Sequence, residues 1–381
     1  MSDHQNSADV PKGPKGLKIG INATFLHEKP TGLGIFTREV SRCIVGAADN
    51  VIVYSPTALR GVAGDCIHKV PLAIGGSMNF KNNIYRLIYI NTVLPAQCRL
   101  DRIDLLYCPM IEYPFVPLVP LVVHVHDLHP IMFPQQFLRA SVHFSFMLRM
   151  LNRAARRVTV VSEYVKNELL ATTKIPENRV DVIPNGYNKD LFQPQDPAMK
   201  GEFLEKYSIS GNYILYVGNL FRYKNVKMLM EAFLRIKDRL DHSLVIVGRR
   251  EFCDETLPCD DKIRFMNYVP DEDLPNFYSY ADLLVHPSLS EGFGLTPLEA
   301  MACGTPVLSS NRASLPEVVG DAGILFNPAD SETLSSLILE VLSNETLLKE
   351  LKKKGFRQAA KFSWEKTAAG LLKSFEKAMN G

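Results

Sequence analysis

The chain has 381 residues, of which 46% are hydrophobic and 22% are charged, and its formal net charge is +2. This length favours two domains of ordinary size, and the near-neutral charge gives no reason to expect a nucleic-acid partner. No uninterrupted apolar run approaches the eighteen or so residues of a membrane span.

The chain begins with a polar stretch, residues 1–16, that contains no apolar core segment. It therefore predicts a disordered tail and not a secretion signal. Seven cysteines, with no C-x-x-C pair among them, favour reduced thiols and a cytoplasmic location. Residues 17–200 carry 20 Lys and Arg against 14 Asp and Glu, whereas residues 201–381 carry 21 against 25. A basic first half favours an anionic partner, such as a lipid surface or a lipid phosphate.

The first half alternates short apolar runs with helical stretches, which predicts a parallel, doubly wound sheet. The expected strands are 18–22, 51–54, 105–107, 121–126, 157–162 and 180–183. A glycine loop, T-G-L-G-I-F, runs from Thr31 to Phe36 between the first strand and a helical pattern. Such a loop lets the backbone around Gly34 approach a phosphate. A lone G-x-G is more often an ordinary turn, and Thr37 stands where the dinucleotide fingerprint needs a third glycine.

Two histidines mark the end of the fourth strand. His124 and His126 lie two residues apart, so their side chains share one face, and Asp127 follows at the strand end. The carboxyl end of a strand in an open α/β sheet is where ligands bind, which favours sugar contact. Zinc binding lacks a third ligand nearby, and a buried structural histidine is the main alternative.

Two stretches of this half are both amphipathic and basic, namely 85–94 and 136–157. The second places five arginines among large apolar residues: Arg139, Arg149, Arg153, Arg156 and Arg157. Helices that face the core and expose their arginines to solvent are the simpler interpretation. A helix on a membrane surface, or an entrance for a lipid-linked acceptor, is the alternative.

A second alternation begins after the stretch Ile183–Pro194. Its expected strands are 213–218, 244–248, 263–265, 283–285, 306–308 and 323–326. The chain thus predicts two Rossmann-like domains with a cleft between them. The expected limits are a tail at 1–16, an N-terminal domain at 17–195, a C-terminal domain at 205–362 and a last helix at 363–381.

Cations follow the first strand of this half. Arg222 and Lys224 lie in a loop just beyond Gly218, where they could neutralise a diphosphate, although a solvated loop is equally compatible with the pattern. The acidic triplet Asp271-Glu272-Asp273 resembles a manganese motif. It stands before a helical pattern, so we interpret it as acidic residues that open a helix.

The densest signal is S-L-S-E-G-F-G-L-T-P-L-E-A-M-A-C-G-T-P, from Ser288 to Pro306. A buried strand, a glycine turn and a short helix would bring free N–H groups to the edge of a sheet, which suits a phosphate. We expect Thr296 as the N-cap residue, and Gly304 as the left-handed helix exit. The carboxylates of Glu291 and Glu299 would bind sugar hydroxyls. Alternatively, Glu299 closes a capping box with Thr296, and Glu291 is a solvated loop residue.

The segment E-G-F-G-L-T-P-L-E resembles the E-x7-E signature of the retaining glycosyltransferases of family 4. H-V-H-D-L-H-P, I-P-N-G and Y-V-G-N-L…K-N are similar to further segments of that family, so the resemblance extends from about Leu17 to the end of the chain. It implies the GT-B fold and a last helix that crosses back onto the first domain. Many relatives carry an arginine directly before the lysine or directly after the glycine, where this chain has Tyr223 and Asn219, and Arg222 is the residue that could replace it.

The resemblance also implies a role for each candidate residue. Glu291, with the backbone of Gly292, Phe293 and Gly294 and with His126, would hold the donor sugar. Lys224, Arg222, Gly34, Leu295 and Thr296 would hold the diphosphate, Glu299 the ribose, Tyr268 and Val269 the base, and Asp127 the acceptor. Among these residues we expect Glu291, Lys224, Arg222 and His126 to act in catalysis.

The implied reaction is the retaining transfer of glucose or mannose from a UDP- or GDP-sugar to a saccharide or lipid-linked saccharide. It would serve cell-surface polysaccharide or glycolipid synthesis. No metal and no other cofactor is expected, and the location would be cytoplasmic, with peripheral contact to the inner face of the membrane left open. The alternatives are a GT-B phosphorylase, a nucleotide-sugar 2-epimerase and a non-catalytic nucleotide-sugar-binding subunit.

Overall fold

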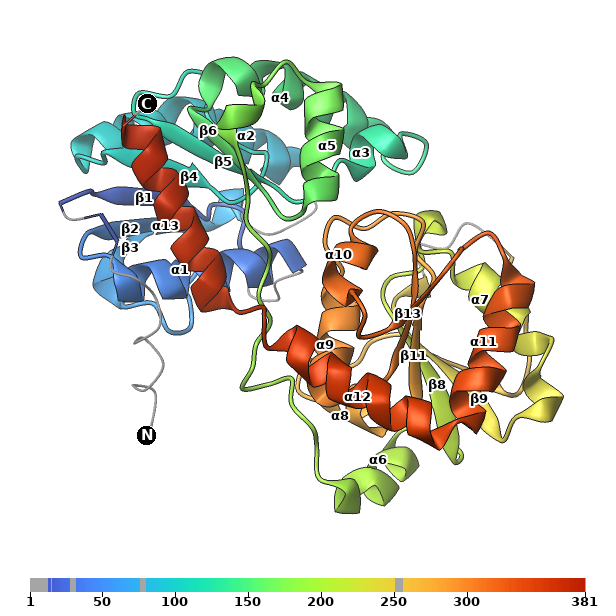
Figure 1. Ribbon diagram of the computed structural model, residues 1–381. Coiled ribbons are helices and arrows are strands. Elements are labelled where there is room, and N and C mark those ends of the chain that lie inside the picture. Colours follow the sequence, from blue (N-terminus) through green and yellow to red (C-terminus); the bar gives the residue numbers. More distant parts are fainter. Residues whose placement is uncertain (1–12, 15, 28–31, 76–79, 251–255, 381) are drawn as a thin grey trace. The chain divides into compact units, whose positions relative to one another are not determined.

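The computed structural model describes residues 13–14, 16–27, 32–75, 80–250 and 256–380. Most of the expected N-terminal tail therefore lies outside the described residues. The chain folds as two compact units (Figure 1). Unit 1 comprises Met1–Gly186 together with Trp364–Gly381, and unit 2 comprises Tyr187–Ser363.

Unit 1 is built on a seven-stranded sheet in the order β3-β2-β1-β4-β5-β6-β7, in which every pairing is parallel. Its strands are β1 (Ile19–Asn22), β2 (Val51–Ser55), β3 (Ile67–Lys69), β4 (Leu105–Cys108), β5 (Leu121–Val125), β6 (Arg157–Val160) and β7 (Val180–Val182). The central strands are buried along their whole length, and for that reason they are continuous apolar runs in the sequence. Among these strands, only β3 was missing from the expectation.

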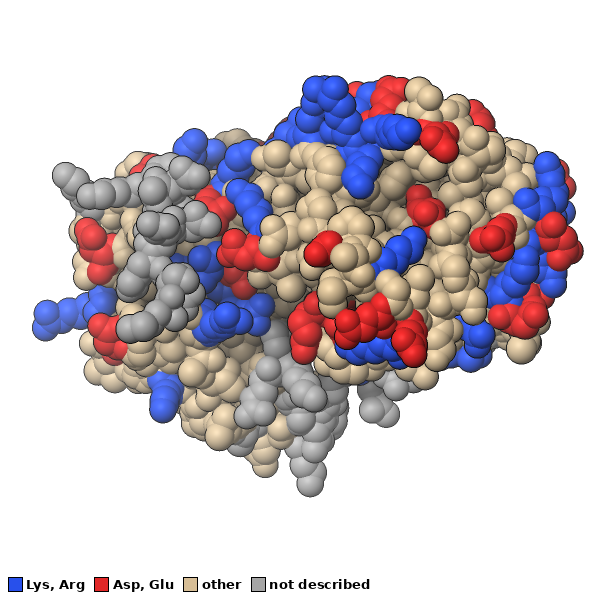
Figure 2. All heavy atoms as spheres, turned by 90° about the horizontal axis from the view of Figure 1, so that it is seen from below, with Lys and Arg blue, Asp and Glu red and all other residues tan. Residues whose placement is uncertain are grey.

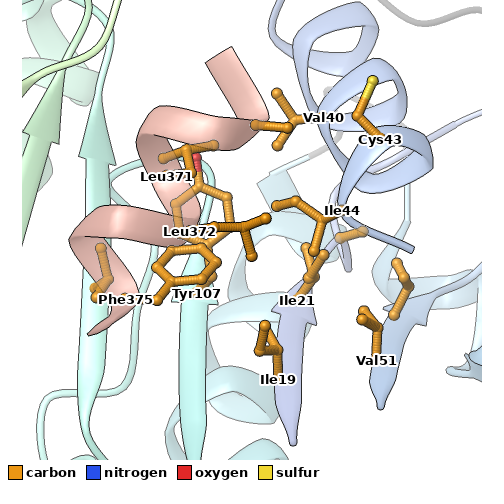
Figure 3. Close-up of a cluster of buried hydrophobic side chains, with 14 of the residues drawn as sticks. Ile19, Ile21, Val40, Cys43, Ile44, Val51, Tyr107, Leu371, Leu372 and Phe375 are labelled. Atoms are coloured by element: carbon orange, nitrogen blue, oxygen red, sulfur yellow. The ribbon is translucent and has the colours of Figure 1, made fainter. Parts of the chain in front are cut away.

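Helices cover both faces of this sheet. They are α1 (Gly32–Ala47), α2 (Phe80–Leu100), α3 (His129–Met132), α4 (Leu138–Ala154), α5 (Glu163–Thr172) and the chain's last helix, α13 (Trp364–Asn380). Figure 3 shows Leu371, Leu372 and Phe375 of α13 directed at α1 and at the strands. Ion pairs hold the same helix, because Asp181 of β7 binds Lys377 at 2.7 Å and accepts a hydrogen bond from Ser374.

Unit 2 is built on a six-stranded parallel sheet in the order β10-β9-β8-β11-β12-β13. Its strands are β8 (Asn212–Val217), β9 (His242–Val247), β10 (Ile263–Met266), β11 (Leu283–His286), β12 (Val307–Ser310) and β13 (Ile324–Phe326). Its helices are α6 (Lys200–Lys206), α7 (Val226–Leu234), α8 (Leu274–Tyr280), α9 (Leu295–Cys303), α10 (Leu315–Val319), α11 (Ser331–Ser343) and α12 (Glu345–Ala359). All six strands had been expected at these places, which confirms the second parallel sheet.

Two glycines let neighbouring loops touch at the carboxyl edge of this sheet. Gly218 follows β8 and Gly248 follows β9. A Cβ atom on Gly248 would lie 1.9 Å from the carbonyl oxygen of Gly218, so no other residue fits there without moving the backbone. The order β9-β8-β11 reverses the direction of winding at β8, and ligands of open α/β sheets bind at such a switch point.

Among the described residues, no helix has the combination of length and hydropathy that crossing a bilayer requires. Figure 2 displays one face of the molecule, over which basic and acidic side chains are interspersed. That mixture fits the small formal net charge of +2.

Candidate functional site

The turn from Glu291 to Gly294 joins β11 to α9 at the carboxyl edge of the unit 2 sheet. Gly294 has a φ of 110°, and a Cβ there would lie 2.9 Å from Leu315 Cδ2, so the position favours glycine on both counts. The buried hydroxyl of Ser314 lies 2.9 Å from the carbonyl oxygen of Glu291 and 2.8 Å from that of Phe293, and donates to them. These bonds fix the turn.

The start of α9 corrects one expectation from the sequence. The helix begins at Leu295 with Gly294 as its N-cap, so Thr296 is the second helical residue and not the cap. The left-handed backbone of Gly294 lets the chain enter the helix two residues earlier than a threonine cap would. Glu299 consequently stands too far along the helix for a capping box with Thr296. The expected exit is confirmed, because Gly304 ends α9 with a φ of 82°.

Glu291 is held from two sides by donors. Lys224 Nζ lies 2.6 Å from Glu291 Oε1, and His286 Nε2 lies 2.7 Å from the same oxygen. A carboxylate can only accept, so the His286 Nε2 atom carries the hydrogen. The side chains of Lys224 and Glu291 are 17% and 11% exposed, respectively, so this is a largely buried ion pair. The alternative of a solvated Glu291 is therefore wrong.

The same contacts set the ionisation of Glu291. Burial by itself would raise the pKa of this carboxyl group, but the charge of Lys224 and the hydrogen bond from His286 outweigh burial and hold the pKa below its usual range. Glu291 therefore remains a carboxylate at neutral pH. An ionised carboxylate is a strong acceptor for sugar hydroxyl groups.

Local backbone bonds place Lys224 at this position. It ends a 3₁₀ turn, Arg222–Lys224, and Asn225 follows in the left-handed conformation. The Asn225 side chain donates to the carbonyl oxygens of Pro287 at 3.3 Å and Pro328 at 2.8 Å, which ties the turn to the end of β11. Of the two expected cations, Lys224 reaches Glu291, whereas Arg222 has an exposed side chain.

Glu299 lies in a different electrostatic environment. Its Oε2 atom accepts a hydrogen bond of 2.9 Å from the Tyr278 hydroxyl, and no cation among the described residues pairs with it. Burial raises the pKa of Glu299 to about 7, against the opposing effect of the Tyr278 hydrogen bond. Its carboxyl group is thus partly protonated at neutral pH. A new hydrogen-bond donor to this group would lower its pKa and favour the carboxylate.

The two residues expected at the base differ in accessibility. Both follow β10, at the end of the sheet. Tyr268 is 65% exposed, whereas Val269 is buried. Only the Tyr268 ring is therefore accessible for stacking on a nucleobase.

The expected residues of unit 1 gather beyond β5. His126 lies just after the end of the strand and not within it. Its Nε2 atom donates to the Pro109 carbonyl oxygen at 2.9 Å, and Phe36 packs edge-on against its ring. Burial lowers the pKa of His126 to about 4, although the Pro109 carbonyl acts in the opposite direction. His126 is therefore neutral at pH 7, with Nδ1 as an acceptor.

Asp127 and Gly34 have structural positions that the sequence pattern did not predict. Asp127 Oδ1 accepts from the backbone N–H of His129 at 3.0 Å, which uses part of its carboxylate to start α3. Gly34 lies in the first turn of α1, not in a loop, because the helix already begins at Gly32. Thr31 is outside the described residues. Gly34 is among the first four residues of α1, whose N–H groups have no partner within the helix.

Both metal alternatives fit the structure poorly. His124 Nδ1 is 2.7 Å from Thr159 Oγ1, in a fully buried position. Asp273 binds Lys206 at 2.7 Å and also accepts from the Tyr207 hydroxyl, immediately before α8. Within the described ranges, no three histidine, cysteine or acidic side chains are grouped as metal ligands would be.

Sequence reasoning missed two residues that shape the site, His286 and Ser314. His286 directly follows the strand expected at 283–285, and Ser314 is remote in sequence from the turn that it fixes. A histidine at the carboxyl end of a buried strand was a signal for the first of them. No sequence pattern pointed to Ser314.

Two family models match this chain, and together they cover most of it. The model described as "Glycosyltransferase Family 4" matches residues 30–191, and "Glycosyl transferases group 1" matches residues 202–358. The first match lies within unit 1 apart from five residues, and the second lies within unit 2.

Several curated proteins and solved structures are similar to the chain. The O-antigen chain mannosyltransferase B of Escherichia coli is 35% identical over 233 residues, which are 58% of this chain and 61% of that protein. The O-antigen chain mannosyltransferase RfbU of Salmonella typhimurium is 30% identical over 227 residues, or 57% and 59%. The matches thus span about three fifths of these relatives' length.

Among solved structures, Anabaena HepE in complex with UDP-glucose has a TM-score of 0.73 at 18% identity, covering 95% of this chain and 100% of that one. The lipopolysaccharide glycosyltransferase WaaG has a TM-score of 0.71 at 17% identity, covering 93% and 99%. These likenesses confirm the GT-B fold. With both family models matched in order along two parallel-sheet units, the chain belongs to the family 4 glycosyltransferases.

Proposed function

We propose that this protein is a retaining hexosyltransferase. It moves a hexose from a nucleoside-diphosphate sugar to a saccharide or lipid-linked saccharide acceptor, in the synthesis of a cell-surface polysaccharide or glycolipid. The single observation that carries the proposal is the buried contact of Lys224 and His286 with one oxygen of Glu291, beside the start of α9.

These groups suit the charges of the reaction. When the bond between the anomeric carbon and the diphosphate breaks, negative charge develops on the diphosphate and positive charge on the sugar. The ammonium group of Lys224 and the N–H groups of Leu295 and Thr296 would stabilise the leaving diphosphate, with Arg222 as an exposed additional cation. The carboxylate of Glu291 would accept hydrogen bonds from the sugar hydroxyls and so orient the ring.

The remaining candidates would complete the substrate contacts. Glu299 would accept from the ribose hydroxyls, and the exposed ring of Tyr268 would stack on the base. In unit 1, the neutral His126 would accept a sugar hydroxyl at Nδ1, while Asp127 and the Gly34 N–H would contact acceptor or phosphate. Fixed cations and helix N–H groups can supply the stabilisation needed, so we propose that no metal is required.

The names of two relatives support mannose as the transferred sugar, because O-antigen mannosyltransferases are among the curated proteins that resemble this chain at 30–35% identity. The structural neighbour HepE was solved with UDP-glucose. We therefore propose mannose as the first candidate, glucose as the second, and leave the base between guanosine and uridine to experiment.

A thermal-shift panel of GDP, UDP and ADP on the purified chain tests the donor. One diphosphate should raise the melting temperature. Its mannose and glucose conjugates are then incubated with acceptor extracts, with and without EDTA, and with donor alone plus inorganic phosphate. Product in the presence of EDTA supports metal-independent transfer. Sugar 1-phosphate formed from donor and phosphate would indicate a phosphorylase, and an isomerised donor would indicate an epimerase.

Variants test the assigned cation. Lys224→Ala should lower turnover by about 100- to 1,000-fold, the effect of removing one donor to a transition-state charge. Arg222→Ala should cost less, because its side chain is exposed. Parent-like turnover in Lys224→Ala would contradict the proposed role of this lysine. If the purified parent chain binds donor but neither hydrolyses nor transfers it, the protein is a non-catalytic subunit.

We further propose that unit 1 contacts an anionic lipid surface. Three apolar side chains of α4 are exposed at four-residue spacing, namely Leu138, Val142 and Phe146. Arg149 and Arg153 follow seven residues after Val142 and Phe146, hence on the same face, and both are exposed. Exposed apolar groups beside cations are the chemistry that an anionic bilayer surface binds.

Vesicle flotation tests this contact. The protein should float with anionic vesicles and less with neutral ones, and salt should weaken the binding. Val142→Asp should reduce flotation, whereas Met199→Asp, which changes an exposed apolar residue of unit 2, should not. Equal flotation with both lipids would show that α4 is a solvated helix, and would leave the sugar chemistry untouched.

A further inference from the structure

Unit 1 contains a cavity whose lining includes Gly34 but otherwise consists of residues that the assignments above do not use. It has a volume of about 490 Å³ and is lined by Leu26, His27, Gly34, Arg38, residues 56–60 and Leu72. This set, called here the Arg38–Arg60 pocket, lies beyond the carboxyl ends of β1 and β2 and beside the first turns of α1. Sites for small molecules typically measure about 300–1,000 Å³, and open α/β sheets bind ligands at this edge.

Among the described residues that line the pocket, the charged side chains are basic and none is acidic. Arg38 and Arg60 contribute two guanidinium groups, and His27 an imidazole. Arg38 uses its Nε atom for Glu39 Oε1 at 3.1 Å, so its two terminal nitrogens can still donate. The described residues supply no carboxylate partner for Arg60, which is exposed. By contrast, Arg86 of unit 1 is paired with Glu112 at 2.6 Å.

The other walls are apolar. Leu26 and Leu59 are buried behind the pocket, and Pro56 and Leu72 line it. Such walls can pack against the C–H face of a sugar ring or against an alkyl chain, while the guanidinium groups bind an oxyanion. Arginine is especially suited to phosphate, because its planar fork donates two parallel hydrogen bonds.

We propose that the Arg38–Arg60 pocket binds a phosphate group of the acceptor. This inference rests on the proposed transfer reaction, and it adds that the acceptor is phosphorylated, either on a sugar or at the end of a lipid. The pocket belongs to unit 1, whereas Glu291, Lys224 and Glu299 belong to unit 2. Arg60 holds the phosphate at the pocket's mouth, and Arg38 holds it from α1.

Calorimetry on the full chain tests the proposal. The protein is first saturated with the nucleoside diphosphate that the thermal-shift panel selects, so that the diphosphate site is filled. Glucose 1-phosphate is then titrated as the probe, with glucose and glucuronic acid as matched neutral and carboxylate probes. The phosphate probe should bind, glucose should not, and glucuronic acid should bind more weakly. A polyprenyl phosphate in detergent micelles forms the lipid arm, and competition between the two phosphates identifies the preferred source.

Arginine variants assign the binding to the pocket. Arg60→Gln and Arg38→Gln should each weaken binding of glucose 1-phosphate by at least about tenfold, as expected for a hydrogen bond to a charged group. Arg99→Gln removes an exposed arginine at the end of α2 and should leave the affinity unchanged. Because Arg60 makes no ion pair in the described structure, its variant should melt like the parent.

Two results would overturn the proposal. One is the absence of phosphate binding in a protein that still binds its nucleoside diphosphate. The other is an equal loss in Arg60→Gln and Arg99→Gln, which would indicate general charge attraction. Failure of the proposed transfer reaction appears differently, as a chain that binds no nucleoside diphosphate at all.

Discussion

Replacing Lys224 by methionine removes the ammonium group beside Glu291 and retains most of the side-chain volume. The carboxylate would then be buried with His286 as its remaining donor. Removing one partner of a buried ion pair costs about 3–5 kcal/mol. Since Lys224 and Glu291 retain 17% and 11% exposure, we expect Lys224→Met to lower the free energy of unfolding of unit 2 by about 3 kcal/mol at pH 7.

The pH dependence provides a sharper test. In the parent, the folded pKa of Glu291 lies below its unfolded value, so its contribution is present above the unfolded pKa of about 4.3 and is lost as pH falls further. Without Lys224, burial should raise the folded pKa above the unfolded one. Protonation of Glu291 then stabilises the folded variant, so the free energy of unfolding of the variant falls as pH rises. The difference between parent and variant in the free energy of unfolding should therefore be smaller at pH 5 than at pH 7.

Urea unfolding of the parent, Lys224→Met, Glu291→Gln and the double variant measures both effects. Circular dichroism follows both units, and fluorescence of Trp364, the chain's only tryptophan, reports on unit 1 as an internal control. Lys353→Met, at an exposed lysine of α12, should change stability by less than about 0.5 kcal/mol. Additive effects of the two single changes, or a gap that widens towards pH 5, would refute the buried-pair reasoning.

Three further outcomes can be checked directly. Because the pKa of Glu299 is about 7 and ribose hydroxyls would lower it, calorimetry in buffers of different ionisation enthalpy should detect proton release when nucleoside diphosphate binds near pH 6.5, and none in Glu299→Gln. Gly248→Ala should destabilise unit 2 far more than Gly211→Ala, whose Cβ meets nothing within 4 Å; equal melting temperatures would contradict the close loop approach. His126→Ala should lower turnover about 100-fold at unchanged nucleoside diphosphate affinity, and a loss of melting temperature alone would indicate a structural histidine.

The strands could be predicted because a buried parallel strand is an apolar run, and such runs are visible in one sequence. The exception is informative. β3 consists of Ile67-His68-Lys69 at the edge of its sheet, where it is only partly buried. A short edge strand needs no continuous apolar run, so its sequence resembles a loop.

Contacts between side chains that are far apart in the sequence could not be predicted from any sequence pattern. The spacing of Glu291 and Glu299 was visible, but the pairing of Glu291 with Lys224 crosses 67 positions of the chain. The start of α9 was misplaced because Thr296-Pro297 is a good helix opening by local preference. In the folded protein, the left-handed backbone of Gly294, which packs against Leu315, instead sets the start of α9 at Leu295.

The two glutamates of the signature illustrate how one short segment provides two kinds of acceptor. They are eight positions apart, yet burial acts on both, and only Glu291 has a cation to oppose it. The pKa of Glu291 is therefore depressed, while burial raises that of Glu299 to about 7. Environments that push the pKa values of two carboxyl groups apart in this way usually give the two groups different chemical roles. Glu291 is a permanent anion that can orient a sugar while positive charge develops, whereas Glu299 becomes fully charged only when hydroxyl donors arrive. A ribose diol bound there would thus complete the site electrostatically as well as sterically.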